Sequence, residues 1–140
     1  MDESRFLQVL KPYCEAFAEH DPDERLELLR AAMTADAEIW GPKQVFAGYE
    51  QISEKITGFH KNWPGCRLAL SRGLNIFLNT ARIGDAIVGH DGAVRARGEA
   101  LIELAPDGRI QRVIPFWEPL PALPASWPKA LAAPCRRNGR

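Results

Sequence analysis

Apolar residues recur every three to four positions in three segments of the first half of the chain, which predicts three amphipathic helices. In residues 4–20 the apolar face consists of Phe6, Val9, Leu10, Tyr13 and Phe17. Pro12 lies inside this first segment, so either the helix is kinked there or a shorter helix ends near Lys11.

The second helix has a clear start signal. Asp21 is the predicted N-cap, Pro22 occupies the first helical position, and Glu24 stands three residues after the cap, as in a capping box. Its buried stripe is Leu26, Leu29 and Met33. The third helix is predicted over residues 49–61 and ends at the Asn-Trp-Pro-Gly turn of residues 62–65.

Most of the remaining chain alternates apolar and polar residues between turn signals, a pattern typical of β-strands. A first short strand, residues 37–40, precedes the Gly41-Pro42 turn. Further strands are predicted at residues 67–71, 74–83, 86–89, 93–104 and 109–118. Three helices followed by a strongly twisted antiparallel sheet make an α+β domain.

The Asp91-Gly92 turn determines which residues of the two flanking strands face each other. With these two residues at the centre of the turn, Asp85 faces Gly98. Asp85 then lies on an apolar face that includes Ile83, Ile87, Ala96 and Ala100. A carboxylate there would have a raised pKa and would suit a general base or acid. A slip of one residue would instead turn Asp85 to solvent.

Composition is that of one ordinary globular domain. Of 140 residues, 46% are hydrophobic and 26% are charged. Residues 119–140 hold five prolines, so we predict a domain over residues 1–118 followed by an extended, proline-rich tail. No apolar run is long enough for a membrane span, and the N-terminal segment lacks the pattern of a signal peptide.

The charge distribution and the cysteines indicate which binding partners and which cellular compartment to expect. Residues 1–60 hold 12 acidic and 6 basic residues, and residues 61–140 hold 6 acidic and 12 basic residues. Because the basic residues of the second half are spread along strands and form no cluster, we predict no nucleic-acid binding. Cys14, Cys66 and Cys135 form no zinc or redox pair, which favours a reducing, cytoplasmic location. The three histidines are too scattered for a metal site, and no nucleotide-binding motif is present, so we predict neither metal nor cofactor.

Several stretches of the chain, taken in order, resemble a known family. They are residues 34–42 (TADAEIWGP), 46–48 (FAG), 74–82 (LNIFLNTAR) and 107–110 (DGRI), with Phe116-Trp117 after them. Over about residues 5–119 this order resembles the SnoaL-like branch of the nuclear transport factor 2-like superfamily. The resemblance implies a cone in which a curved sheet wraps around the helices and leaves a deep apolar pocket. Members include isomerases, dehydratases, epoxide hydrolases, polyketide cyclases and non-enzymatic binding modules, so the fold alone does not give the function.

The resemblance also indicates catalytic positions. Ketosteroid-isomerase-like members use a tyrosine of the first helix as an oxyanion donor, and Tyr13 occupies the matching place. Their general-base aspartate corresponds to Gly41, which cannot take a proton. SnoaL-like cyclases carry an acid on a middle strand, and counting back from Gly108 places it at Ala100 or, with one extra turn residue, at Glu99. Strand alternation puts Glu99 on the polar face, among arginines.

Our catalytic candidates are Tyr13, His60, Asp85 and Glu99. His60 ends the third helix beside an apolar face and could shuttle protons near neutral pH, or it could cap the last carbonyls of that helix. The aromatic side chains predicted to bind a substrate are Trp40, Phe46, Phe59, Trp63, Phe77, Phe116 and Trp117.

Two functions remain open. One is a cofactor-independent isomerase, cyclase or lyase that moves a proton on a small apolar organic ligand, with Asp85 or Glu99 as base. The other is a non-enzymatic ligand-binding or dimerisation module, which the absence of an acid at Gly41 and Ala100 favours. We also predict a homodimer through the polar sheet face, where Arg95, Arg97, Glu99 and Glu103 would meet a second copy.

Overall fold

The computed structural model describes residues 2–134, so that Cys135 and the last residues of the predicted tail lie outside the described part. Within these residues there are three α-helices, α1 (Glu3–Ala18), α2 (Pro22–Ala32) and α3 (Gly48–Asn62), and a short 3-10 helix, η1 (Lys129–Leu131). The strands are β1 (Met33–Trp40), β2 (Val45–Ala47), β3 (Arg67–Phe77), β4 (Thr80–Val88), β5 (Val94–Leu104) and β6 (Ile110–Trp117). The predicted α+β class is confirmed.

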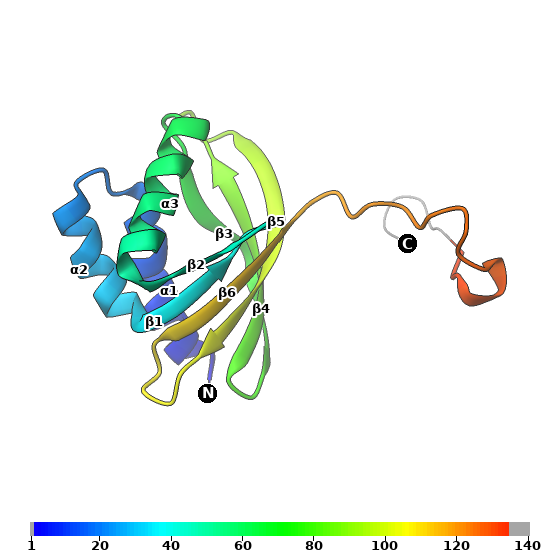
Figure 1. Cartoon of the computed structure of the whole chain (residues 1–140), viewed down its shortest axis with the longest axis horizontal. Coiled ribbons are helices and arrows are strands. Elements are labelled where there is room, and N and C mark those ends of the chain that lie inside the picture. The colour runs from blue at the N-terminus through cyan, green and yellow to red at the C-terminus, as the bar shows by residue number, and fades with distance from the viewer. Residues whose placement is uncertain (1, 135–140) are drawn as a thin grey trace.

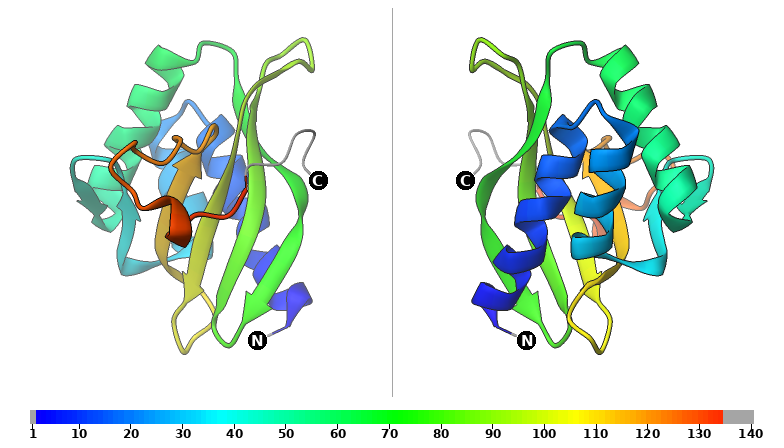
Figure 2. Two further views of the ribbon diagram at one scale, coloured as in Figure 1. Left: turned by 90° about the vertical axis from the view of Figure 1, so that its right-hand side faces the viewer. Right: turned by 90° about the vertical axis from the view of Figure 1, so that its left-hand side faces the viewer.

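All six strands form one curved sheet in the order β2-β1-β6-β5-β4-β3. The helices cover its concave face, and no helix of the described chain covers the opposite face (Figures 1 and 2). The expectation of a purely antiparallel sheet is wrong, because β1 runs parallel to β6. This pairing joins segments about 75 residues apart along the chain, which local sequence patterns cannot reveal.

The helices begin close to where the sequence predicts and differ in detail. α1 continues through Pro12 to Ala18, because its apolar side chains stay buried along the whole length. Asp21 caps α2, its carboxylate accepting from the backbone N–H of Asp23 at 2.9 Å. The carboxylate that accepts from the backbone N–H of Asp21 belongs to Glu19, at 3.4 Å, and not to Glu24 of the expected capping box.

The β3–β4 hairpin corrects one predicted strand. Residues 74–83 are not continuous, because the chain turns between Phe77 and Thr80. The turn residue Leu78 has a φ of 56°, which is a left-handed conformation. Leucine rarely adopts this conformation, so the sequence does not indicate a turn there. The predicted break at Arg72 is instead a bulge within β3, between Leu70 and Leu74.

The hydrophobic core fills the space between the concave sheet face and the helices. Its largest fully buried apolar side chains include Phe6, Leu10, Leu29, Ile52, Ile102 and Val113. One cation is buried with them: Arg25 of α2 donates to the backbone carbonyls of Glu19 and Ser53 and to the hydroxyl of Thr57, at 2.8 to 3.0 Å. These bonds hold α2 against α3 and against the end of α1.

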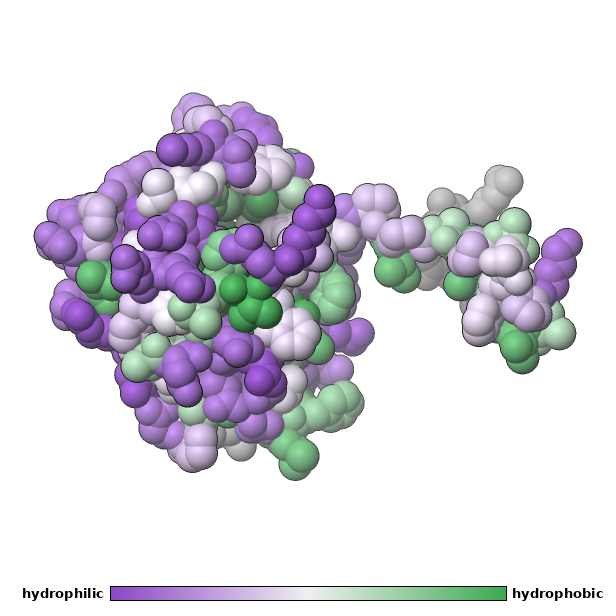
Figure 3. All heavy atoms as spheres, in the orientation of Figure 1, coloured by the Kyte–Doolittle hydropathy of each residue, from purple (hydrophilic) through white to green (hydrophobic). Residues whose placement is uncertain are grey.

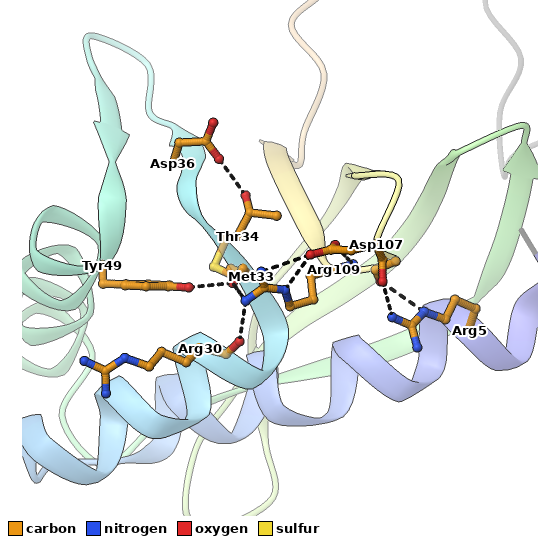
Figure 4. A network of polar contacts seen from close by, with 9 residues as sticks. Arg5, Arg30, Met33, Thr34, Asp36, Tyr49, Asp107 and Arg109 are labelled. Atoms are coloured by element: carbon orange, nitrogen blue, oxygen red, sulfur yellow. Dashed lines mark hydrogen bonds and ion pairs between the residues drawn. The ribbon is translucent and has the colours of Figure 1, made fainter.

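A polar network closes the end of the molecule where the β5–β6 turn lies (Figure 4). Arg5 of α1 donates to two backbone carbonyls of this turn, at 2.8 and 3.2 Å. Arg109 pairs with Asp107 at 2.9 Å and donates to the carbonyl of Met33 at 3.3 Å. The hydroxyl of Tyr49 donates to the same Met33 carbonyl at 2.9 Å. These bonds tie α1, the β5–β6 turn, β1 and α3 together.

After β6 the chain leaves the body and runs away from it (Figure 1). Glu118 is still held to the sheet, since its backbone N–H donates to the carbonyl of Arg97 at 2.9 Å. From Pro119 to residue 134 the hydrogen bonds are local, such as the one from the Trp127 indole to the carbonyl of Leu131 at 3.0 Å. Leu120, Leu123 and Leu131 are exposed along it. The space-filling view shows hydrophobic surface on this segment (Figure 3). No helix within residues 2–134 is long and apolar enough to cross a membrane.

Candidate functional site

A cavity of about 420 Å³ lies between α1, α3 and the concave face of the sheet. Most of its lining is apolar or aromatic. The polar or ionisable lining residues are Tyr13, Glu54, Lys55, Asn62 and Asp85. A mostly apolar cavity with a few polar groups is typical of sites for small organic molecules.

Asp85 reaches this cavity from β4 and is only 5% exposed. It pairs with Gly98, the register predicted from the hairpin, and Gly98 in turn pairs with Trp117 of β6. A Cβ added to Gly98 would lie 2.6 Å from the Phe116 carbonyl oxygen, 2.8 Å from the Trp117 ring and 3.2 Å from Asp85 Oδ1. The missing side chain at Gly98 therefore makes room for both the carboxylate and the indole.

The Asp85 carboxylate lacks the partners that a buried acid normally has. Oδ1 is fully buried and has no hydrogen-bond partner among the described residues. Burial raises the pKa of Asp85 from 3.8 to about 6, and its own backbone N–H and the charge of Arg72 act in the opposite direction. Near neutral pH the group can therefore take up or release a proton.

Tyr13 lines the same cavity from α1 and is also 5% exposed. Its ring packs edge-on against Phe17 at 5.2 Å, and none of the hydrogen bonds of residues 2–134 uses its hydroxyl. Burial above all, and then the charges of Cys14 and Asp85, raise the pKa of Tyr13 well above its usual value. The phenol is therefore protonated at neutral pH and is available as a hydrogen-bond donor.

His60 does not line the cavity. Its Nε2–H donates to the backbone carbonyl of Phe17 at 2.7 Å, and its ring stacks on His20 at 4.0 Å. Burial lowers the pKa of His60. The side chain joins the end of α3 to the last turn of α1, so the carbonyl that it caps belongs to α1 and not, as the alternative expected, to α3.

Glu99 lies on the outer face of the sheet, as strand alternation predicts. Its carboxylate is 3.3 Å from the guanidinium of Arg72 and 3.8 Å from that of Arg82. The sheet separates it from the cavity, so it cannot act on a ligand bound beside Asp85.

Only some of the predicted aromatic residues line the cavity. Phe46, Phe59, Trp63 and Trp117 line the cavity. Trp40, Phe77 and Phe116 do not. Trp40 follows the cavity residue Ile39 and Phe116 precedes Trp117, so alternation turns both outward, while Phe77 is 73% exposed beside the β3–β4 turn.

Comparison with known proteins rests on structure alone, since no protein-family profile and no curated protein sequence matches the chain. A candidate isomerase of the SnoaL-like family from Agrobacterium tumefaciens superposes with a TM-score of 0.74 at 24% identity, covering 83% of this chain and 99% of its own. A candidate SnoaL-like polyketide cyclase from a Jannaschia species has a TM-score of 0.66 at 15% identity, covering 83% and 87%. A SnoaL-like protein of unknown function from Burkholderia thailandensis reaches 0.63 at 14%, covering 85% and 99%.

The chain has the SnoaL-like fold. Of the positions where the resemblance implies an acid, Gly41 and the Ala100 alternative hold none, and the Glu99 alternative does not line the cavity. Gly41 lies in the β1–β2 turn, where its N–H donates to the carbonyl of Gln44 at 2.7 Å, and it does not line the cavity. Ala100 does line it, and its methyl group offers no chemistry. Asp85, one strand away, supplies a carboxylate from a different position in the sheet.

Three polar or ionisable residues that line the cavity were not predicted as site residues from the sequence: Glu54, Lys55 and Asn62. A signal for Lys55 existed, because it stands three residues after Ile52 and four before Phe59, at the edge of the apolar face of α3. Among residues 2–134, no group of three or more His, Cys, Asp or Glu side chains could hold a metal ion.

Proposed function

We propose that the cavity binds a small, largely apolar organic molecule and that Asp85 moves a proton on it. The observation that carries this proposal is the buried Asp85 carboxylate, which has an unpartnered oxygen and a pKa of about 6 on an apolar wall. Structural ion pairs do not account for such a group, and a carboxyl poised near neutral pH suits general acid–base chemistry.

The residues support a simple reaction sequence. The Asp85 carboxylate takes a proton from a carbon next to a ligand carbonyl, and the C–H electron pair moves toward the carbonyl oxygen. The hydroxyl of Tyr13 donates a hydrogen bond to that oxygen as its negative charge grows. The protonated Asp85 then returns the proton to the same or another carbon. This sequence needs no cofactor and fits isomerisation, cyclisation or elimination chemistry.

A non-enzymatic binding module is the second candidate. Ala100 favours it in the register that matches this residue to the acid of SnoaL-like cyclases, because the position then holds only a methyl group in this cavity. The two candidates differ in one property: a binding module would hold an apolar molecule without exchanging its protons.

Proton exchange tests the proposal without knowledge of the natural substrate. β-Tetralone and similar apolar ketones would be incubated with the protein in deuterium oxide, and loss of the acidic C–H signal followed by proton NMR. We expect wild-type protein to accelerate the loss, Asp85→Asn to slow it by about 100-fold or more, and Tyr13→Phe by about 10- to 100-fold.

Glu99→Gln is the matched control, since it removes a carboxylate on the opposite face of the sheet and should leave the exchange rate unchanged. Binding of the ketones without any accelerated exchange would support the binding module and overturn the enzymatic proposal. Equal rates for wild type and Asp85→Asn would do the same.

We further propose a homodimer through the outer sheet face. That face carries the exposed Phe116 and Leu101 beside the ion pairs of Glu99, a mixture suited to an interface. Sedimentation at micromolar concentration should give a dimer, and a monomer there would contradict this proposal.

A further inference from the structure

Lys55 is the cation that lines the cavity. It projects from α3 and is half-buried, and its Nζ lies 4.8 Å from the centre of the Phe46 ring. Phe46 lines the cavity from β2. The ammonium group is therefore held over an aromatic face at the cavity wall, where any bound molecule would meet it.

The charge of Lys55 has no acidic partner within the described chain. No ion pair within 4 Å joins it to any carboxylate of residues 2–134. Glu54 precedes it and also lines the cavity, but Glu54 is exposed and faces the groove between α2 and α3 as well. Burial alone lowers the pKa of Lys55, in keeping with a cation that lacks a counter-charge.

Lys55 and Asp85 stand at different parts of the cavity wall. The aromatic partner of Lys55 is on β2, and Asp85 is on β4, which is four places away in the sheet. Neighbouring strands are about 4.8 Å apart, so the path along the sheet is about 19 Å, and the curvature shortens the direct distance. An elongated molecule can therefore meet both groups with different ends.

We propose that the ligand is an apolar keto carboxylate, with its carboxylate at Lys55 and its carbonyl-activated carbon near Asp85. The position of the carbonyl rests on the proposed function, whereas the anion at Lys55 follows from the cavity alone. Separation of the two groups keeps the ligand's negative charge away from the Asp85 carboxylate. It also gives the ligand one orientation in an otherwise apolar cavity.

Two dyes with the same aromatic body test the anion preference. Anilinonaphthalene sulfonate is anionic and phenylnaphthylamine is neutral, and both fluoresce when they enter an apolar cavity. Wild-type protein should bind the anionic dye more tightly. Lys55→Met keeps an apolar side chain of similar length and should weaken anionic binding about 10-fold, with neutral binding changed less than about 2-fold.

Three further variants sharpen the result. Lys55→Arg keeps the charge and should restore anionic binding, while Lys61→Met, at the exposed end of α3, should leave both dyes unaffected. Glu54→Gln removes a nearby negative charge and should strengthen anionic binding. Thermal melts of all variants establish that they are folded.

The inference is overturned if Lys55→Met weakens both dyes equally, because Lys55 would then only shape the cavity. It is also overturned if Lys61→Met matches the effect of Lys55→Met, because the dye would then respond to general surface charge. Failure of the proposed function is distinct: Asp85→Asn would leave ketone exchange unchanged while the Lys55-dependent preference for the anionic dye persisted.

Discussion

Replacing Asp85 by Asn should stabilise the protein at neutral pH, although it removes a side chain from the proposed site. Asn has the shape of the acid and no charge, so it resembles protonated Asp85. Because Oδ1 has no hydrogen-bond partner among residues 2–134, the charged form has little that offsets the cost of its burial.

The magnitude follows from the pKa. A group with a pKa of about 6 in the folded chain and 3.8 when unfolded binds its proton more tightly in the folded state. Its stabilising contribution is therefore complete below about pH 4 and is lost as the pH rises through 6. The full loss would be about 3 kcal/mol, and screening by solvent reduces it, so we expect roughly 1 to 2 kcal/mol.

Urea unfolding followed by tryptophan fluorescence measures this quantity across a pH series. The free energy of unfolding of Asp85→Asn minus that of wild type should grow by about 1 to 2 kcal/mol between about pH 4 and pH 8. Asp107→Asn is the matched control with the opposite sign. The backbone N–H and side chain of Arg109 hold the pKa of Asp107 below its usual value, so its contribution is present at neutral pH and lost in acid.

A difference between Asp85→Asn and wild type that does not change with pH would refute the reasoning. So would a variant that becomes less stable than wild type only as the pH rises. Either result would mean that the carboxylate has a partner in the folded state and titrates as an ordinary acid.

Three other changes probe the framework of the site. Gly98→Ala should lower the free energy of unfolding by about 1 to 3 kcal/mol, because the added Cβ would lie 2.6 Å from a backbone oxygen. Gly58→Ala in α3 is the control: its added Cβ would meet no atom within 4 Å, so it should cause no loss of stability. Arg25→Met should cost about 3 kcal/mol, since several buried acceptors lose their donor; a loss below 1 kcal/mol, roughly, would contradict that role. A chain ending at Glu118 should melt at the same temperature as the full chain if residues 119–140 are a separate tail, and a lowered Tm would contradict the predicted boundary.

Features with a local cause could be predicted from the sequence. The cap at Asp21 and the pairing of Asp85 with Gly98 depend on residues close together in the chain. The β4–β5 hairpin differs slightly from the prediction at its turn, where the Gly92 N–H donates to the Gly89 carbonyl. A bulge between Ile87 and Val88 then restores the predicted register farther along the strands.

Features that depend on distant contacts could not be predicted. The parallel β1–β6 pair joins segments with no local signal between them, and the turn at Leu78 contains no glycine or proline to mark it. The aromatic set shows a further limit. Phe116 and Trp117 are adjacent in one strand and cannot both face the cavity, so alternation alone excludes one of them, and only the fold shows which.

Two glycines in neighbouring strands, Gly98 of β5 and Gly84 of β4, shape the surroundings of the Asp85 carboxylate. On the inner face, Gly98 leaves space for Asp85 and Trp117, and burial raises the pKa of the Asp85 carboxyl. On the outer face, the Arg72 side chain lies over Gly84, where an added Cβ would be 2.7 Å from its Nε. Arg72 thereby brings a positive charge close to the residue next to Gly84 in the chain and lowers the pKa of Asp85. The pKa of about 6 results from burial, which raises it, against the backbone N–H of Asp85 and the charge of Arg72, which lower it. A side chain at either glycine would disturb this arrangement.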